Sequence, residues 1–317
     1  LSEVKKSAQL FLNLIFLSIC LSACNKNEDN SEDNSADRQR VIDDYNNVYL
    51  TTELSSNSWT GNTSNCIAGT VSAEAIDKAF KRINYFRRMT GFSETITNDK
   101  SLNPLCQEAA LMCMANNQIN HYPPASWKCF TPNGSTACQS SNLSISPNKD
   151  LSLPASITAF INDYGDMNSS VGHRRWILYS NATEFGIGGS KSTGALWVIQ
   201  KSKPISLDNV ETGPNYISWP PKGYCPASLV FDRWSFGKKN ADLSKTEVIM
   251  KDQNGVPVEL EVVSRATGPG DNSIVWEPKD INRNSAEDVS YTVNLTKVRV
   301  GLFDSSYTYK VTLIQPK

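Results

Sequence analysis

The sequence predicts an α+β protein in which an α/β sandwich is followed by an all-β, immunoglobulin-like sandwich. Three amphipathic helical patterns lie between residues 72 and 164, and short apolar runs separated by Gly and Ser follow them. Alternating apolar and polar residues with turn signals then extend from about residue 219 to the end of the chain. A chain of 317 residues is also long enough for two domains of ordinary size.

Residues 1–24 have the features of a lipoprotein signal peptide. Lys5 and Lys6 precede an apolar stretch, Leu10 to Leu21, which has signal-peptide length and is too short to span a bilayer. The following Leu21-Ser22-Ala23-Cys24 resembles a bacterial lipobox, in which the cysteine is lipidated and becomes the mature N-terminus. We therefore expect an exported lipoprotein of the cell envelope, at the outer membrane or cell surface, anchored through Cys24. The alternative is an ordinary secretory signal with an incidental cysteine.

Residues 25–65 are predicted to form a flexible tether and an irregular lead-in to the first domain. From Asn25 to about Asp44 the chain is rich in Asn, Asp, Glu and Ser and has almost no large apolar residue. Such a segment cannot bury enough apolar surface to offset the entropy lost on ordering.

The balance of charge argues against a nucleic-acid partner. Thirty-one basic and 32 acidic residues leave a net charge of −1, and no Lys/Arg-rich run is present. We expect no nucleic acid among the partners.

The first domain is predicted to span residues 66–203 and to begin with helices. Ser72 is suited to cap a helix that Gly91 ends, and two further helical patterns run from about Leu102 to Asn117 and from Ser156 to Tyr164. Residues 125–155, rich in Ser, Pro, Asn and Gly, are predicted to be a loop. Strands are expected afterwards at Trp176–Tyr179, Glu184–Gly188 and Ala195–Ile199.

The second domain is predicted to span residues 205–317 and to be a β-sandwich of six or seven strands. Asn254-Gly255 is a strong signal for a type I′ hairpin between two of them. Aromatic residues gather near the start of this region and could face a glycan or the first domain, although alternating aromatics are more often core. They are Trp219, Tyr224, Trp234 and Phe236.

Six cysteines would remain in the mature protein if Cys20 leaves with the signal and Cys24 is acylated. An even number in an exported protein favours disulfides, but six cysteines allow 15 full pairings. Cys129 and Cys138 enclose a short Thr-Pro-Asn-Gly-Ser segment, so we predict that these two are bonded. The absence of any Cys-x-x-Cys pair argues against a zinc knot.

The chain contains only two histidines, His121 and His173. Imidazole changes charge near neutral pH and is the commonest metal ligand, so two that converge would make a site. The alternative is that each packs or caps locally. His121 follows a helix and precedes Pro123 and Pro124, which would stiffen its loop.

Residues 66 to about 203 resemble the CAP (cysteine-rich secretory and pathogenesis-related) superfamily, and the region after them resembles a β-sandwich extension of some bacterial members. The motif Val171-Gly172-His173-Arg174-Arg175-Trp176 is the most specific part of the resemblance. It is supported by Ile83 to Gly91, Gln107-Glu108-Ala109-Ala110, Asn120-His121 and Ser141-Asn142-Leu143.

The resemblance implies an α-β-α sandwich whose cleft holds two histidines and two acidic residues, a set that binds a divalent metal in some members. His121 and His173 match the histidines, and Asp163 matches the acid that precedes the second one. The other acid belongs to a Gly-Glu-Asn-Leu motif that reads Ser140-Ser141-Asn142-Leu143 here, so Ser141 replaces a glutamate. The ligand cleft expected from the resemblance consists of His121, Ser141, Asn142, Asp163, His173 and Arg174.

A divalent metal such as zinc would be held by His121, His173 and Asp163, with one negative charge fewer than in the family. The alternative is that both histidines are only hydrogen-bonded. A serine-histidine-aspartate triad has no supporting sequence motif, so we name no catalytic residue.

We expect a non-enzymatic binding or interaction protein at the cell envelope. Its partner would be an envelope lipid or a protein, as the resemblance implies for some members. One alternative is a divalent-metal-dependent hydrolase acting on envelope peptides. Another is a structural or adhesive surface module that acts through the β domain.

Overall fold

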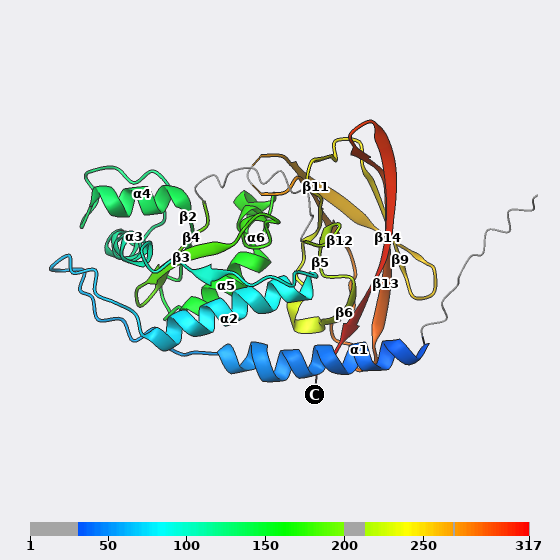
Figure 1. The fold of residues 1–317 in the computed structure, drawn as a ribbon, viewed down its shortest axis with the longest axis horizontal. Helices are drawn as coiled ribbons and strands as arrows, with labels where there is room; N and C mark the ends of the chain where they lie inside the picture. The colour runs from blue at the N-terminus through cyan, green and yellow to red at the C-terminus, as the bar shows by residue number, and fades with distance from the viewer. Residues whose placement is uncertain (1–30, 200–212, 269, 317) are drawn as a thin grey trace, which may run out of the picture.

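A computed structural model of the protein describes residues 31–199, 213–268 and 270–316 and shows an α+β architecture (Figure 1). The α-helices are α1 (Ser31–Asp44), α2 (Ala73–Met89), α3 (Asn103–Asn116), α4 (Pro132–Ser140), α5 (Leu153–Asn162) and α6 (Gly172–Ile177). The predicted signal peptide with Cys24 and the predicted domain boundary at residues 203–205 lie outside the described residues. Within the described ranges, no helix has the length and hydrophobicity needed to cross a membrane.

The first half of the described chain is an α-β-α sandwich. Its sheet has the order β1-β3-β4-β2, with β1 parallel to β3. The strands are β1 (Thr97–Asn98), β2 (Ser141–Ile145), β3 (Glu184–Gly189) and β4 (Thr193–Trp197). α3 packs on β3 and β4 from one face, and α5 packs on β2 from the other together with α2 (Figure 1). α3 comes this close because Gly188 lacks a side chain, since a Cβ there would lie 2.4 Å from the Gln107 nitrogen.

The C-terminal half is all-β and contains two sheets. The six-stranded sheet has the order β10-β9-β13-β14-β6 with β8 paired to β13, and the four-stranded sheet has the order β11-β12-β7-β5. The strands are β5 (Ile217–Trp219), β6 (Gly223–Pro226), β7 (Trp234–Gly237), β8 (Ala241–Asp242), β9 (Glu247–Asp252), β10 (Pro257–Val258), β11 (Leu260–Ala266), β12 (Ser273–Pro278), β13 (Val289–Val300) and β14 (Phe303–Ile314). The predicted hairpin joins β9 and β10, but only Gly255 has a positive φ there, so its turn is not type I′.

The three predicted helices of the first half are present, and their caps explain where they begin. The Ser72 hydroxyl accepts a hydrogen bond from the Ala75 nitrogen at 3.1 Å at the start of α2. Ser152 does the same for Ala155 at the start of α5. α3 ends at Asn117, which adopts the left-handed conformation.

Residues 31–44 form helix α1, so the prediction of a flexible tether is wrong for this segment. α1 packs on β6 in the C-terminal half, where Ile42 is buried. Arg38 makes a two-bond ion pair with Asp288, at 2.7 and 2.9 Å. The helix has only a narrow apolar stripe, and a composition argument cannot detect the distant surface that covers this stripe.

Residues 125–155 are not only a loop, since they contain α4 and β2. The Thr131 hydroxyl accepts from the Gly134 nitrogen at 2.9 Å, and Pro132 occupies the first turn of α4. The helix is built mostly of small and polar residues, so its sequence shows no apolar helical period. The predicted strand Trp176–Tyr179 is also wrong, because Trp176 and Ile177 end helix α6.

The disulfide joins Cys66 to Cys129, so the predicted Cys129–Cys138 bond is wrong. The segment between those two residues is the cap and body of α4, which places the Cys138 thiol in the core beneath the helix. Among the described cysteines, the free ones are Cys106, Cys113, Cys138 and Cys225, all buried.

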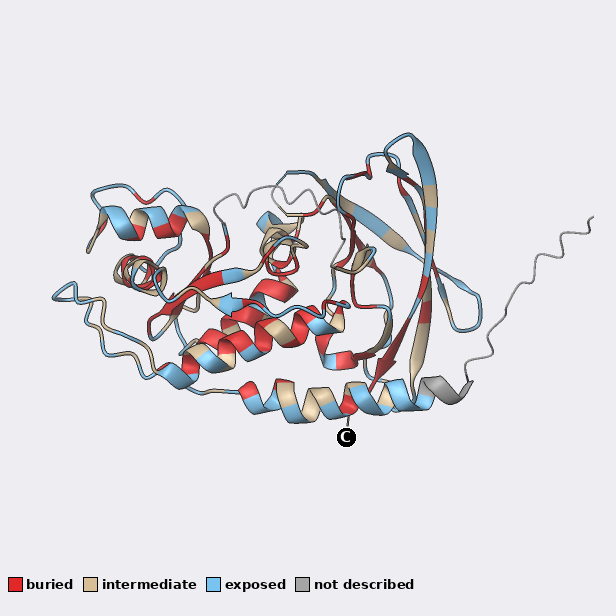
Figure 2. Ribbon diagram, in the orientation of Figure 1, coloured by how far each residue is buried: buried red, intermediate tan, exposed pale blue. Residues whose placement is uncertain are grey.

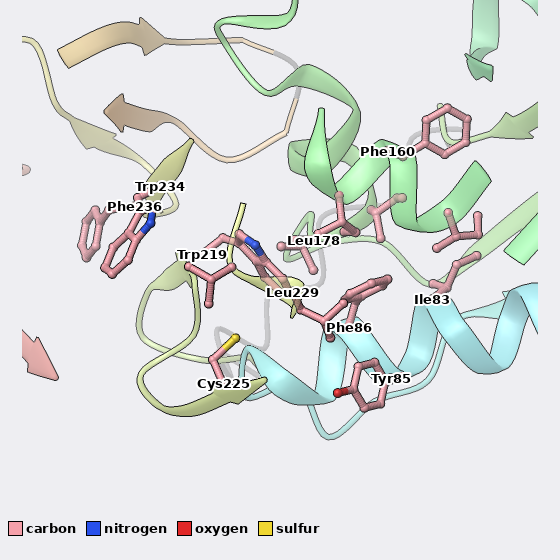
Figure 3. Close-up of a cluster of buried hydrophobic side chains, with 14 of the residues drawn as sticks. Ile83, Tyr85, Phe86, Phe160, Leu178, Trp219, Cys225, Leu229, Trp234 and Phe236 are labelled. Atoms are coloured by element: carbon pink, nitrogen blue, oxygen red, sulfur yellow. The ribbon is translucent and has the colours of Figure 1, made fainter. Parts of the chain in front are cut away.

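One apolar cluster continues from the α-β-α half into the β half (Figures 2 and 3). Phe86 of α2 meets Trp219 of β5 edge-on, with ring centroids 5.5 Å apart. Trp219, Trp234 and Phe236 are fully buried, so they belong to the core and not to an exposed binding surface. The two halves therefore share a core, which fixes their mutual orientation.

Candidate functional site

The second predicted histidine forms a close pair with the predicted acid. Nδ1 of His173 lies 2.7 Å from Oδ1 of Asp163, and the two side chains are 21% and 0% exposed. The imidazole ring also packs on Phe160, with ring centroids 5.3 Å apart. Since a carboxylate can only accept, Nδ1 carries a proton, and in the neutral imidazole Nε2 is the acceptor.

Asp163 also holds the start of helix α6. Its Oδ2 accepts hydrogen bonds from the backbone nitrogens of His173 at 2.8 Å and Arg174 at 3.3 Å. Val171, which precedes α6, is left-handed and offers no cap of its own. Asp163 follows α5 in a left-handed conformation, with φ 54°, and this turn aims its carboxylate at α6.

The first predicted histidine is exposed and lies beyond the end of α3. Nδ1 of His121 donates to the Cys138 carbonyl oxygen at 2.7 Å. This bond places a proton on Nδ1, so in the neutral imidazole of His121 Nε2 is the acceptor.

Ser141 and Asn142, two other predicted cleft residues, are neighbours in strand β2 and point to opposite faces of it. Asn142 donates from Nδ2 to the His173 carbonyl oxygen at 3.0 Å, so it faces α6. Ser141 points to the opposite face, as neighbours in a strand do, and its buried hydroxyl has no hydrogen-bond partner among the described residues. The structure thus joins His121 and His173 to one short segment, at Cys138 and at Asn142. We call His121, Asn142, Asp163 and His173 the histidine site.

Arg174 does not belong to the cleft, so its prediction as a ligand residue is wrong. Its side chain is fully buried and points toward the β half. The guanidinium donates to the carbonyl oxygens of Ile161, Asn162 and Arg233 and to the Ser235 hydroxyl, at 2.6 to 3.2 Å. Burial lowers the pKa of Arg174 to about 9, against the opposing effect of nearby Asp163, so it stays charged at neutral pH.

The predicted three-ligand metal set is not formed. Within the described ranges, no group of three or more His, Cys, Asp or Glu side chains is placed to hold a metal ion. Both Asp163 oxygens already accept hydrogen bonds from His173 and Arg174. Glu108, a substitute acid on α3, instead accepts from the Thr131 hydroxyl at 2.5 Å. The donor set therefore falls short of the three protein ligands that a catalytic zinc requires.

A groove that the sequence did not indicate lies elsewhere, between the two halves. It has a volume of about 730 Å³ and is bounded by α1, the end of α2, β6 and β14. None of the residues of the histidine site lines it. Its walls come from four segments that are far apart in the chain, so no local motif could have revealed it.

Comparison with known proteins supports the family resemblance. Residues 80–200 match the model of the cysteine-rich secretory protein family, CAP. No curated protein matches the chain. Two crystal structures of PcoC, a methionine-rich copper resistance protein from Escherichia coli, match at 14% and 15% identity, with TM-scores of 0.23 and 0.22. Each match covers 30% of this chain and 92% or 94% of PcoC, and at these scores it supports no conclusion. The fold and the matched residues together identify the α-β-α half of this chain as a CAP domain.

Proposed function

We propose that this CAP-type protein is a non-enzymatic binding protein of the cell envelope, whose partner is an envelope lipid or a protein. The observation that carries the proposal is the state of Asp163. Its carboxylate is buried, caps α6 and orients His173, so it is not exposed to a substrate as a base or as a metal ligand would be.

The rest of the histidine site also lacks the parts of a hydrolytic centre. Ser141 lies on the face of β2 opposite to the Asn142–His173 contact, so it cannot serve as a nucleophile activated by His173. A nucleophile paired with a base is the minimum for covalent catalysis. The two imidazoles instead present their Nε2 atoms as hydrogen-bond acceptors for a partner.

The metal-dependent hydrolase is the outcome that would overturn this proposal. Both histidines donate from Nδ1, to Asp163 and to the Cys138 carbonyl, an arrangement that also accompanies metal-binding histidines. Zinc calorimetry should therefore be run on the chain from residue 25 onward and on a His121→Ala/His173→Ala variant. We expect the wild type and the variant to give equally small heats of zinc binding. Both should also cleave a peptide library only at the background rate. Stoichiometric zinc uptake that both histidines require, with zinc-dependent cleavage, would contradict the proposal.

The envelope location is tested separately through Cys24. The full chain should incorporate labelled palmitate and fractionate with membranes, and Cys24→Ser should do neither. A membrane-bound Cys24→Ser variant would contradict the lipid anchor.

A further inference from the structure

The groove between α1, the end of α2 and strands β6 and β14 has the size of a small-molecule site. Its volume of about 730 Å³ falls within the usual range for ligand pockets, roughly 300–1,000 Å³. α1, at one end of the described chain, and β14, at the other, both contribute walls, and β6 lies between them as the sheet edge. The inference below rests on the proposed binding function and names the site and class of ligand for it.

The charged side chains of the groove are mostly cationic. Arg88, Lys222 and Lys310 are exposed, and within the described ranges none of them forms an ion pair. Arg40 is neutralised by Asp37 at 2.9 Å, and Asp44 is the remaining acid. Three unpaired cations around one cavity attract an anionic group and leave a surplus of positive charge after Asp44 is counted.

Three lining residues of the groove are apolar, and another, Tyr85, carries an unsatisfied polar atom. Met89 and Val41 are half-buried, and Phe92 is buried. Tyr85 is only 2% exposed, and its hydroxyl has no hydrogen-bond partner. Figure 3 shows this hydroxyl turned toward the side of Cys225 in β6, and Tyr85 itself is one of the residues that line the groove.

A buried hydroxyl without a partner costs free energy unless something outside the chain satisfies it. Burial raises the pKa of Tyr85, so its hydroxyl keeps its proton and can donate to an anion. The residues that line the groove thus include a buried donor, three exposed cations and three apolar side chains.

We propose that this groove binds an amphiphilic anion, a molecule with one phosphate or carboxylate group and a single apolar chain. Arg88, Lys222 and Lys310 hold the anionic group. Tyr85 donates a hydrogen bond to the anionic group, and the apolar chain of the ligand lies on Val41, Met89 and Phe92.

The test is calorimetry of octyl phosphate with the chain from residue 25 onward, which keeps every described residue. Octanol reports the binding of the alkyl chain alone, and inorganic phosphate reports the binding of the head group alone. We expect one octyl phosphate per protein and affinities at least about tenfold lower for the two partial ligands. Arg88→Gln and Lys310→Gln should each weaken binding about tenfold, and Tyr85→Phe about fivefold.

Lys251→Gln is the matched control, because Lys251 is an exposed cation on β9 outside the groove. It removes the same charge and should leave binding unchanged, and unfolding midpoints should show that all variants fold. Absence of octyl phosphate binding, equal binding of octanol, or equal losses in Lys251→Gln would overturn the inference.

Binding only to phosphatidylglycerol vesicles, with no binding of monomeric octyl phosphate, would also overturn it, since that result describes a membrane-contact surface. Each of these failures leaves the proposed binding function standing. Zinc-dependent cleavage that requires His121 and His173 would defeat the proposed function without affecting the groove.

Discussion

Asp163 links the histidine site to the fold, because one carboxylate both orients His173 and caps α6. Here the geometry of the site and the stability of a short helix depend on the same two oxygens, so a change at Asp163 should alter both together.

Replacing Asp163 with Asn should lower the free energy of unfolding by about 1–3 kcal/mol. An amide can keep only one of the two acceptor positions, so either the α6 cap or the His173 contact is lost. Urea denaturation measures the first effect, and nitrogen NMR of the imidazole measures the second as a loss of the single Nδ1–H tautomer. Asp166→Asn, an exposed change in the same loop, is the control. An unchanged tautomer in Asp163→Asn would contradict the role assigned to it.

Asp271 should make stability depend on pH. It is buried between the halves, where burial raises its pKa although hydrogen bonds from the Ser180 nitrogen and hydroxyl oppose this. The folded protein therefore keeps a proton on Asp271 at pH values where the unfolded chain, with its ordinary pKa of 3.8, has lost it. The protonated carboxyl contributes its full stabilisation below pH 3.8, the pKa in the unfolded chain. This stabilisation is lost as the pH rises through the higher pKa of the folded protein.

The measurement is the free energy of unfolding of the wild type and Asp271→Asn from acid to neutral pH. The variant should gain on the wild type as the pH rises, by about 1.4 kcal/mol for each unit of pKa shift. Two parallel curves would show that Asp271 titrates alike in both states.

The helices predicted from the sequence combine local start or stop signals with an apolar period, whereas α4, which has the local Thr131 cap but no apolar period, was missed. α2 and α5 begin at serine caps, and α3 ends at Asn117, all of which are local. α6 is capped by Asp163 across a loop, and α1 is stabilised by strand β6, which lies far from it in the chain, so neither has a local signature. The fold class depended on the local signals and was predicted correctly.

The same distinction applies to the candidate site. The family resemblance predicted His121, His173 and Asp163 as a group; the structure pairs His173 with Asp163, whereas His121 bonds the Cys138 carbonyl oxygen, a contact that the sequence could not assign. Arg174 was misread because its decisive contacts, with Arg233 and Ser235, come from 59 and 61 residues further along the chain. The groove depends on side chains from four elements and had no sequence signal at all.

The Cys66–Cys129 disulfide ties the lead-in segment before α2 to the loop before α4, which are 63 residues apart. Replacing both cysteines with serine should lower the free energy of unfolding by about 2–5 kcal/mol, because the unfolded chain regains the entropy of an open loop. Alkylation followed by mass spectrometry checks the pairing. In the denatured, unreduced protein, Cys113 and Cys138 should both be labelled and Cys66 should not. Protection of Cys138 together with labelling of Cys66 and Cys113 would restore the pairing that the sequence suggested.

For the molecule as a whole, the shared core predicts that both halves unfold together. Arg174 reinforces this, since it bonds residues on both sides of the boundary from a fully buried position. Calorimetry should therefore show one transition for the wild type.

Arg174→Met should remove about 3 kcal/mol or more, because four acceptors lose their donor in a buried place. It should also broaden the transition or split it into two. Arg299→Met, which disrupts only an exposed pair with Asp304, should shift the midpoint by no more than a degree or two. A sharp single transition in Arg174→Met, at the wild-type temperature, would show that the halves do not depend on this residue.

The position of α1 has a practical consequence for handling the protein. α1 packs on β6, and the end of β14 pairs with the same strand at Ile314, so both ends of the described chain lie on one side of the β half (Figure 1). A tag or linker at either end would attach the protein to a sensor chip by that side. The groove beside α1 would then lie close to the support in both formats. Assays of the groove should therefore be run in solution.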